Sequence, residues 1–208
     1  MRPQHIFLFA LCGIALLWSW VNNPDTFIWA LEASPGILAC IILLGTYKKF
    51  QFTTLAYFFV LLHCIVLFIG AKYTYGEVPL FNWLRDTYAL ERNNYDKVGH
   101  FAQGFFPALL VRELIIRLNL VNGRNWTKFF VVSVCLAASA CYELIEWLVS
   151  VLVSDEGSVD AFLGTQGYIW DTQSDMLFAL VGATVMVLFF SKIHDKALHA
   201  LSASQQRP

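Results

Sequence analysis

Charged residues are scarce in this sequence of 208 residues: they make up 14% of the chain, whereas soluble domains contain about 25%. Neither sign dominates, since the formal net charge is -1. No group of Lys and Arg is dense enough to follow the phosphates of a nucleic acid, so we exclude nucleic acid as a partner. A nucleophile elbow, a phosphate-binding loop and an HExxH motif are also lacking, so serine acyl transfer, P-loop chemistry and the usual zinc proteolysis have no support.

Cysteines are few, and no two of them form a CxxC pair. All five fall inside apolar runs rather than in loops, which favours small buried hydrophobic residues over disulfides or metal ligands. They are Cys12, Cys40, Cys64, Cys135 and Cys141.

Apolar residues, by contrast, are abundant: they make up 58% of the chain, and the mean hydropathy is +0.58. A helix needs roughly 20 mostly apolar residues to cross a hydrocarbon core about 30 Å thick. Six runs meet this requirement, so we predict an all-α membrane protein: one bundle of about six transmembrane helices, forming a single polytopic domain over residues 1–208. The fourth run is the weakest, because its second half carries three charged residues that we place near a headgroup layer. The predicted spans are 6–21, 27–45, 53–71, 98–120, 126–153 and 172–191.

Lys and Arg predict the orientation, because cytoplasmic loops near helix ends carry an excess of them. With both termini cytoplasmic, ten basic residues lie inside and four lie outside. The aromatic outer segment 72–97 is then expected on the outer interface, and segment 164–170 is expected to form a second cap there. The four outer basic residues are Lys72, Arg85, Arg92 and Lys97.

Two acids interrupt the fifth apolar run, in the stretch Cys-Tyr-Glu-Leu-Ile-Glu-Trp-Leu at 141–148. Glu143 lies 15 residues after Lys128, roughly 22 Å from the inner face at 1.5 Å per residue, and Glu146 lies about one turn further out. An acid near the bilayer centre costs about 2.5 to 3.5 kcal/mol, so such acids are kept where they face the bundle interior and meet a partner. The simplest alternative is a structural, hydrogen-bonded pair of acids between helices.

Other ionisable residues are expected at the same depth, from four further segments. Two pairs with i, i+4 spacing stand at outer helix starts, and two single residues lie in the outer halves of the second and third spans. They are Asp96 with His100, Asp171 with Asp175, Glu32 and His63.

Several of these residues also have ordinary structural interpretations. Asp96 and Asp171 each stand where a helix begins, and Asp is a favoured N-cap. His63 is alternatively a hydrogen-bonded core residue, and Glu32 one that reaches the headgroups or pairs with a lysine. Lys97 is a candidate for an ion pair with Asp171 or Asp175.

Three motifs in this order resemble the YjdF-like family of bacterial inner-membrane proteins. They are YDKVGHFAQGF at 95–105, YELIEW at 142–147 and GTQGYIWDTQSDM at 164–176. The resemblance extends over nearly the whole chain. It implies a multi-pass protein of the bacterial inner (plasma) membrane and supplies no reaction.

The converging acids and histidine predict a site for a divalent metal ion, since carboxylates with imidazole suit zinc, manganese or iron. The first hypothesis is a membrane enzyme whose metal activates water or polarises a substrate such as a lipid headgroup. Glu143 and Glu146 are its candidate catalytic residues. The candidate metal ligands are Asp96, His100, Glu143, Glu146, Asp171 and Asp175.

Two other hypotheses stay open. In a proton- or cation-coupled small transporter, the same acids would form the coupling site. In a non-catalytic scaffold, the cluster would only fix the packing of the helices. We expect membrane lipid as a partner, and the sequence identifies no protein partner.

Overall fold

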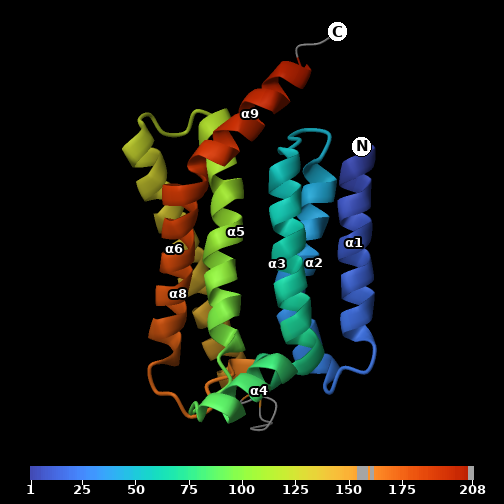
Figure 1. The fold of residues 1–208 in the computed structure, drawn as a ribbon, viewed down its shortest axis with the longest axis vertical. Helices are drawn as coiled ribbons and strands as arrows, with labels where there is room; N and C mark the ends of the chain where they lie inside the picture. Colours follow the sequence, from blue (N-terminus) through green and yellow to red (C-terminus); the bar gives the residue numbers. More distant parts are fainter. Residues whose placement is uncertain (154–158, 160–161, 206–208) are drawn as a thin grey trace.

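The computed structural model describes residues 1–153, 159 and 162–205 (Figure 1). All regular elements in these residues are helices, which confirms the predicted all-α membrane fold. The elements are α1 (Pro3–Trp20), α2 (Thr26–Thr46), α3 (Thr54–Tyr73), the 3-10 turn η1 (Tyr75–Glu77), α4 (Pro79–Tyr88), α5 (Tyr95–Arg117), α6 (Arg124–Leu152), α8 (Asp171–Val185), the π-helical turn η2 (Met186–Phe190) and α9 (Ser191–Gln205).

The first five predicted spans agree with α1, α2, α3, α5 and α6 to within three residues at each end. Five helical stretches are long and apolar enough to cross a membrane: α1, α2, α3, α6, and the continuous stretch Asp171–Ser204 that joins α8 to α9. Helix α5 has 23 residues, also enough to span, but charged residues stand near both of its ends. The count of six crossings therefore stays a prediction, with α5 as the unconfirmed member.

The helices form two groups joined through α3 and α5. Helices α1 and α2 pack on α3, and helices α6 and α8 pack on α5 (Figure 1). Helix α4 lies across one end of the bundle, between the end of α3 and the start of α5, and both chain termini lie at the opposite end. We call these the α4 end and the terminal end. Termini at one end agree with an even number of crossings.

Local chemistry sets the start and the course of α2. Asp25 caps the helix, because its carboxylate accepts hydrogen bonds from the backbone N–H groups of Phe27 and Ile28 at 2.7 and 3.1 Å. Pro35 inside the helix has no N–H to donate to the carbonyl of Leu31. The Ser34 hydroxyl donates to that carbonyl at 2.8 Å instead, so α2 continues past the proline.

Helices α5 and α8 approach each other closely because glycines face the neighbouring backbone. A Cβ atom on Gly104 would lie 1.9 Å from the carbonyl oxygen of Ala179, and one on Gly182 would lie 2.2 Å from that of Phe101. Small residues at such crossings let membrane helices pack backbone to backbone. The crossing fixes the starts of α5 and α8, where the candidate site residues lie, against one another.

The last helix is longer than predicted. The sequence predicts an end near residue 191, where the apolar run stops, but the helix continues through η2 and α9 to Gln205. In the π-helical turn, the Ser191 hydroxyl donates to the carbonyl of Val187 at 2.6 Å. Helix α9 then leaves the bundle at a slant (Figure 1). The prediction was too short because a hydropathy run marks the apolar part of a helix and not its end.

Candidate functional site

Four segments bring the candidate residues together at the α4 end: the start of α5, the part of α6 around Glu143, the start of α8 and the loop before α5. A cavity of about 50 Å³ opens between them and the two neighbouring helices. Its lining includes Glu32 of α2, His63 of α3, Asp96 and His100 of α5, and Glu146 of α6. Residues expected at one depth from five different helices therefore line one volume or stand beside it.

Two basic side chains hold the aspartates of the cluster. Lys97 donates to Asp171 at 3.0 Å and to Asp175 at 2.6 Å, and its Nζ lies 3.6 Å from an Asp96 oxygen. Arg92 pairs with Asp171, and its guanidinium lies 3.4 Å from Asp96. The predicted pairing of Lys97 with Asp171 or Asp175 occurs with both. All five side chains are buried, so the pairs act in a medium of low dielectric.

His100 lies on the other side of Asp96 and Asp175. Its Nε2 is 3.3 Å from Asp96 Oδ1 and 3.8 Å from Asp175 Oδ2, while the second oxygen of each carboxylate faces Lys97. Its Nδ1 lies 3.2 Å from Gln103 Oε1, which is an acceptor, so Nδ1 carries a proton. One ligand atom from each of Asp96, His100 and Asp175 lies within 4.8 Å of the others.

Glu143 and Glu146 face this cluster from α6. Glu143 is buried, and its Oε1 lies 3.7 Å from His100 Nδ1. That oxygen has no hydrogen-bond partner among the described residues. The alternative of a structural, hydrogen-bonded acid pair between helices stays open for Glu143 and Glu146. Glu146 lines both the 50 Å³ cavity and a second cavity of about 180 Å³, which Glu143, Asp171 and other residues also line.

The observed surroundings of Glu32 and His63 contradict the ordinary structural interpretations given for them above. Glu32 is 2% exposed, so it does not reach the headgroups. It accepts one long hydrogen bond, from the backbone N–H of Tyr75 at 3.4 Å, and its other oxygen finds no partner in the part of the chain that the structure describes. The buried Nε2 of His63 likewise has no hydrogen-bond partner among the described residues, and the His63 ring stacks on Phe106. Burial raises the pKa of the neighbouring Tyr75 phenol well above its usual range, so this hydroxyl stays protonated.

Helix capping does not explain Asp96 and Asp171. Each lies inside the first turn of its helix, and the side chains of the N-cap residues, Asn94 and Trp170, make no cap hydrogen bond. Both carboxylates turn to Arg92 and Lys97 instead. Asp171 pairs with these two bases and is not part of the group of three possible metal ligands, Asp96, His100 and Asp175.

Two loops close the site. Arg92 donates to the backbone carbonyls of Gly164 and Thr165, both at 3.1 Å. Gln166 accepts from the backbone N–H of Asn93 and donates to the backbone carbonyl of the same residue, both at 2.9 Å. The segment 164–170 predicted as a cap is therefore fastened to the loop before α5.

Arg92 and Gln103 are the members of the site that the sequence analysis left out. Arg92 was counted only as an outer positive charge, although it precedes Asp96 by one helical turn. Gln103 follows His100 at i+3, a spacing that places two side chains on one helix face. These spacings were the available signals, and neither indicates a contact with α8 or α6.

A second buried polar network occupies the terminal end. Glu113 is 0% exposed and accepts from the backbone N–H and the hydroxyl of Thr53, each at 2.8 Å, and from Arg117 at 2.9 Å. Arg112 donates to His194 Nδ1 at 2.8 Å, so the Nε2–H of His194 faces Glu113 at 3.2 Å. Protein groups surround Arg112 and Glu113, and the expected position of these charges near a headgroup layer stays a prediction.

Comparison with known proteins then identifies the family. A family model described as "Predicted membrane protein (DUF2238)" matches residues 4–196. The chain belongs to this family. A curated relative, the inner membrane protein YjdF of Escherichia coli (strain K12), is 43% identical over 185 residues, which is 89% of this chain and 88% of that protein. No solved structure matches the chain.

Membership of the DUF2238 family confirms the resemblance seen in the three motifs and the prediction of a multi-pass inner-membrane protein. The family description names no reaction and no ligand. What the site does must therefore be argued from its own geometry.

Proposed function

We propose that this DUF2238 protein is a metal-dependent enzyme whose site, at the outer leaflet, acts on the polar headgroup of a membrane lipid. One observation carries the proposal: His100 Nε2 lies 3.3 and 3.8 Å from the nearest oxygens of Asp96 and Asp175. Two ligands bound about 2.1 Å from a tetrahedral metal ion stand about 3.4 Å apart. The three side chains match the spacing of a three-ligand metal site.

The protonation of His100 supports this ligand set. With a proton on Nδ1, the ring directs Nε2 at two carboxylate oxygens. Such a contact is repulsive unless a proton or a metal ion lies between the groups. Metal-binding histidines usually donate their second N–H to an oxygen acceptor, as Nδ1 does here toward Gln103.

The charge balance of the cluster also favours a cation. Five carboxylates, from Asp96, Asp171, Asp175, Glu143 and Glu146, share two permanent positive charges, those of Arg92 and Lys97. With all five carboxylates ionised, three negative charges would be in excess in a medium of low dielectric, and a divalent cation would offset two of them where protonation does not. A mixed set of imidazole and carboxylate suits zinc, manganese or iron.

The remaining acids suit the chemistry of a bound water. Three protein ligands leave a position open for water, and a metal ion lowers the pKa of that water so that it loses a proton near neutral pH. Glu143, whose Oε1 lies 3.7 Å from His100 Nδ1, and Glu146, which lines the 50 Å³ cavity, would accept that proton. The 50 Å³ cavity has room for at least one water molecule.

The second cavity supports a lipid headgroup as the substrate. It holds about 180 Å³, and its lining combines Glu143 and Glu146 with Thr165, Thr172 and Trp147. Trp147 of α6 is 61% exposed. A polar group tethered to a lipid would meet the candidate proton acceptors through this cavity without leaving the membrane.

Metal analysis and lipid turnover test the proposal together. We expect the protein purified in detergent to bind one zinc or manganese ion per chain, and proteoliposomes to release headgroups from a bacterial phospholipid mixture, followed by phosphorus NMR. Asp175→Asn should abolish both, and Glu143→Gln/Glu146→Gln should abolish release. Asp86→Asn, which changes an exposed acid of α4, is the matched control and should change neither. Absence of bound metal, with no effect of added cations on thermal stability, would refute the proposal.

The buried Glu113 network at the terminal end favours a second candidate function, a proton- or cation-coupled transporter. Buried Glu113 and His194 at the terminal end are ionisable groups of the kind that relays use. Packed rings of Phe59, Phe105 and Phe190 lie between α3, α5 and η2. Ion flux into proteoliposomes under an imposed proton or cation gradient separates the two functions, because the enzyme predicts none.

A further inference from the structure

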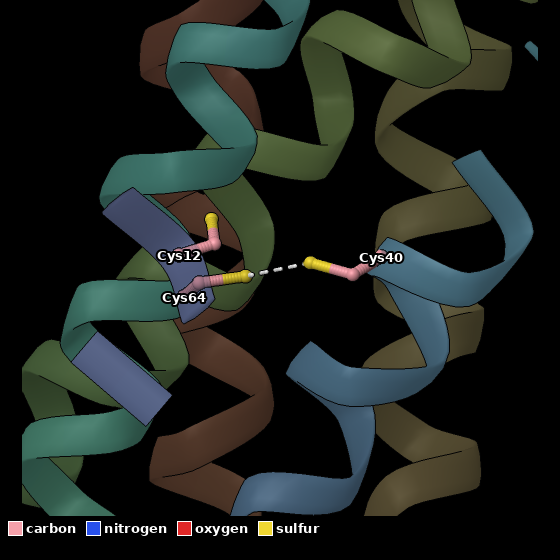
Figure 2. A group of neighbouring side chains, drawn as sticks. All are labelled: Cys12, Cys40 and Cys64. Carbon is pink, nitrogen blue, oxygen red and sulfur yellow. Dashed lines mark hydrogen bonds between the residues drawn. The ribbon is translucent and has the colours of Figure 1, made fainter. Parts of the chain in front are cut away.

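Three thiols from three helices converge at a point outside the site described above. The Sγ atoms of Cys12 in α1, Cys40 in α2 and Cys64 in α3 all lie within 4.8 Å of one another. Figure 2 shows Cys40 and Cys64 pointing toward each other, with Cys12 beside them. Cys12 and Cys64 are buried and Cys40 is half-buried. Each lies inside a helix that is long and apolar enough to cross the membrane.

The spacing of the thiols differs from that of a disulfide. The Sγ atoms of Cys40 and Cys64 are 3.9 Å apart, about twice the length of an S–S bond. Two sulfur ligands that share a metal ion at about 2.3 Å stand about 3.8 to 4.0 Å apart, for angles between tetrahedral and trigonal. The observed distance of 3.9 Å agrees with two sulfur ligands of one metal ion.

Cys12 and Cys64 belong to the buried apolar core and Cys40 packs against it, but core packing does not require three thiols to meet. The Cys64 thiol makes weak sulfur contacts with the carbonyl oxygen of Gly36 at 3.8 Å and with Cys40 at 3.9 Å. Cys135 shows what an isolated structural cysteine looks like in this chain, buried on α6 and outside the thiol group. Cys12, Cys40 and Cys64 instead present three soft donors to one point.

We propose that Cys12, Cys40 and Cys64 form a three-coordinate site for a thiophilic metal ion, with Cu(I) as the ion that fits best. Thiolates select soft ions such as Cu(I) and zinc, and structural zinc sites almost always take four ligands. Cysteine ligands bind as thiolates, so binding of Cu(I) would release the thiol protons, and the positive charge of the ion would offset one of the resulting negative charges.

A third cavity, distinct from the two at the carboxylate cluster, gives an ion a route to the thiols. It holds about 220 Å³ and is lined by Cys64, Gly36, His63 and other residues of α2, α3 and α5. It shares Pro35, His63 and Leu67 with the 50 Å³ cavity at the α4 end, so the two are adjacent. The unpartnered Nε2 of His63 is an imidazole donor on this route, and imidazole is also a copper ligand.

Competition with a chromogenic chelator tests the site on the full-length protein in detergent. The wild-type protein, kept reduced without oxygen, should withdraw one Cu(I) per chain from the bicinchoninate complex. Cys12→Ala, Cys40→Ala and Cys64→Ala should each lose this binding. Cys135→Ala, a matched buried control, and Cys141→Ala, an exposed one, should keep it. Copper retained by the triple variant Cys12→Ala/Cys40→Ala/Cys64→Ala would overturn the proposal.

X-ray absorption on the wild-type protein tests the site even if a variant fails to fold. The copper edge and its fine structure should show a reduced ion with three sulfur neighbours at one short distance. Nitrogen or oxygen neighbours would overturn the proposal, and so would recovery of Cys40 and Cys64 as a disulfide from protein isolated without reductant. The inference is independent of the proposed enzyme, since Asp175→Asn should bind Cu(I) as the wild type does.

Discussion

Arg92 connects several parts of the site at the α4 end. It is 8% exposed and contacts two carboxylates, those of Asp96 and Asp171, and the backbone carbonyls of Gly164 and Thr165. It therefore joins α5, α8 and the loop before α8. Removing it leaves buried carboxylates with one base fewer and two carbonyls without their donor.

Arg92→Ala should destabilise the protein by about 3 to 5 kcal/mol, the cost of breaking a buried ion pair. Arg85→Ala is the control, because Arg85 pairs with an Asp86 side chain that is 68% exposed, and it should cost under about 1 kcal/mol. Thermal and denaturant unfolding of the two variants in the same detergent gives the comparison. Equal losses would show that the Arg92 network contributes no more than a surface pair.

Gln103→Leu should weaken metal binding at the proposed centre by about 10- to 100-fold, as the loss of a partner of a metal-bound histidine usually does. The substitution removes the oxygen that lies 3.2 Å from His100 Nδ1 and leaves the three ligands in place. Isothermal titration with zinc measures the change. Unaltered affinity would mean that Gln103 does not orient His100.

Residue spacing and depth identified the acids and the histidine, but not the bases that hold them. The i, i+4 pairs Asp96 with His100 and Asp171 with Asp175 are visible in the sequence. The contact of Arg92 with Asp171 spans 79 positions. Nothing local signals such a contact, because it depends on how α5 and α8 pack.

At the scale of elements, the crossing of α5 and α8 sets the geometry of the proposed centre. Gly104 and Ala179 touch at this crossing. His100 lies one turn before Gly104, and Asp175 lies one turn before Ala179. The distance between these two site residues is therefore controlled by two small residues one helical turn away.

Gly104→Ala should destabilise the protein by about 1 to 3 kcal/mol through overpacking, because the new Cβ would lie 1.9 Å from a backbone oxygen. It should also weaken metal binding by moving Asp175 away from His100. Gly13→Ala in α1 meets nothing within 4 Å, and it should raise stability by up to about 1 kcal/mol through helix propensity. Unfolding curves and zinc titrations of both variants check this, and a harmless Gly104→Ala would contradict the close packing.

Hydropathy located most of the helices but not the full length of the last one. The apolar run stops near Phe190, yet α9 continues because His194 and Asp195 contact Arg112 of α5. Polar tertiary contacts of this kind hold a helix together beyond its apolar part and leave no mark in a hydropathy profile. Convergence of the three thiols was hidden for a similar reason, since Cys12, Cys40 and Cys64 come from separate helices.

At the scale of the whole molecule, polar networks lie at both ends of an apolar bundle. The carboxylate cluster lies at the α4 end, and the Glu113 network lies at the end that also holds both termini (Figure 1). The excess of Lys and Arg predicts that the terminal end is cytoplasmic. This orientation places the proposed metal centre at the outer leaflet.

Topology reporters test the orientation. A fluorescent protein fused after Pro208 should be fluorescent, and alkaline phosphatase inserted in α4 at Trp83, which is exposed, should be active because it is exported. The reverse pattern would move the carboxylate cluster to the cytoplasmic side. An odd number of crossings would give termini on opposite sides, as two terminal reporters would show.

The account rests on a metal ion held by Asp96, His100 and Asp175, and anomalous scattering from crystals grown with zinc tests it most directly. The account predicts one strong peak about 2.1 Å from His100 Nε2 and from a carboxylate oxygen of each aspartate, and no such peak in Asp175→Asn. Crystals of the wild-type protein with no peak there, and with Lys97 and Arg92 as the sole partners of these carboxylates, would contradict it.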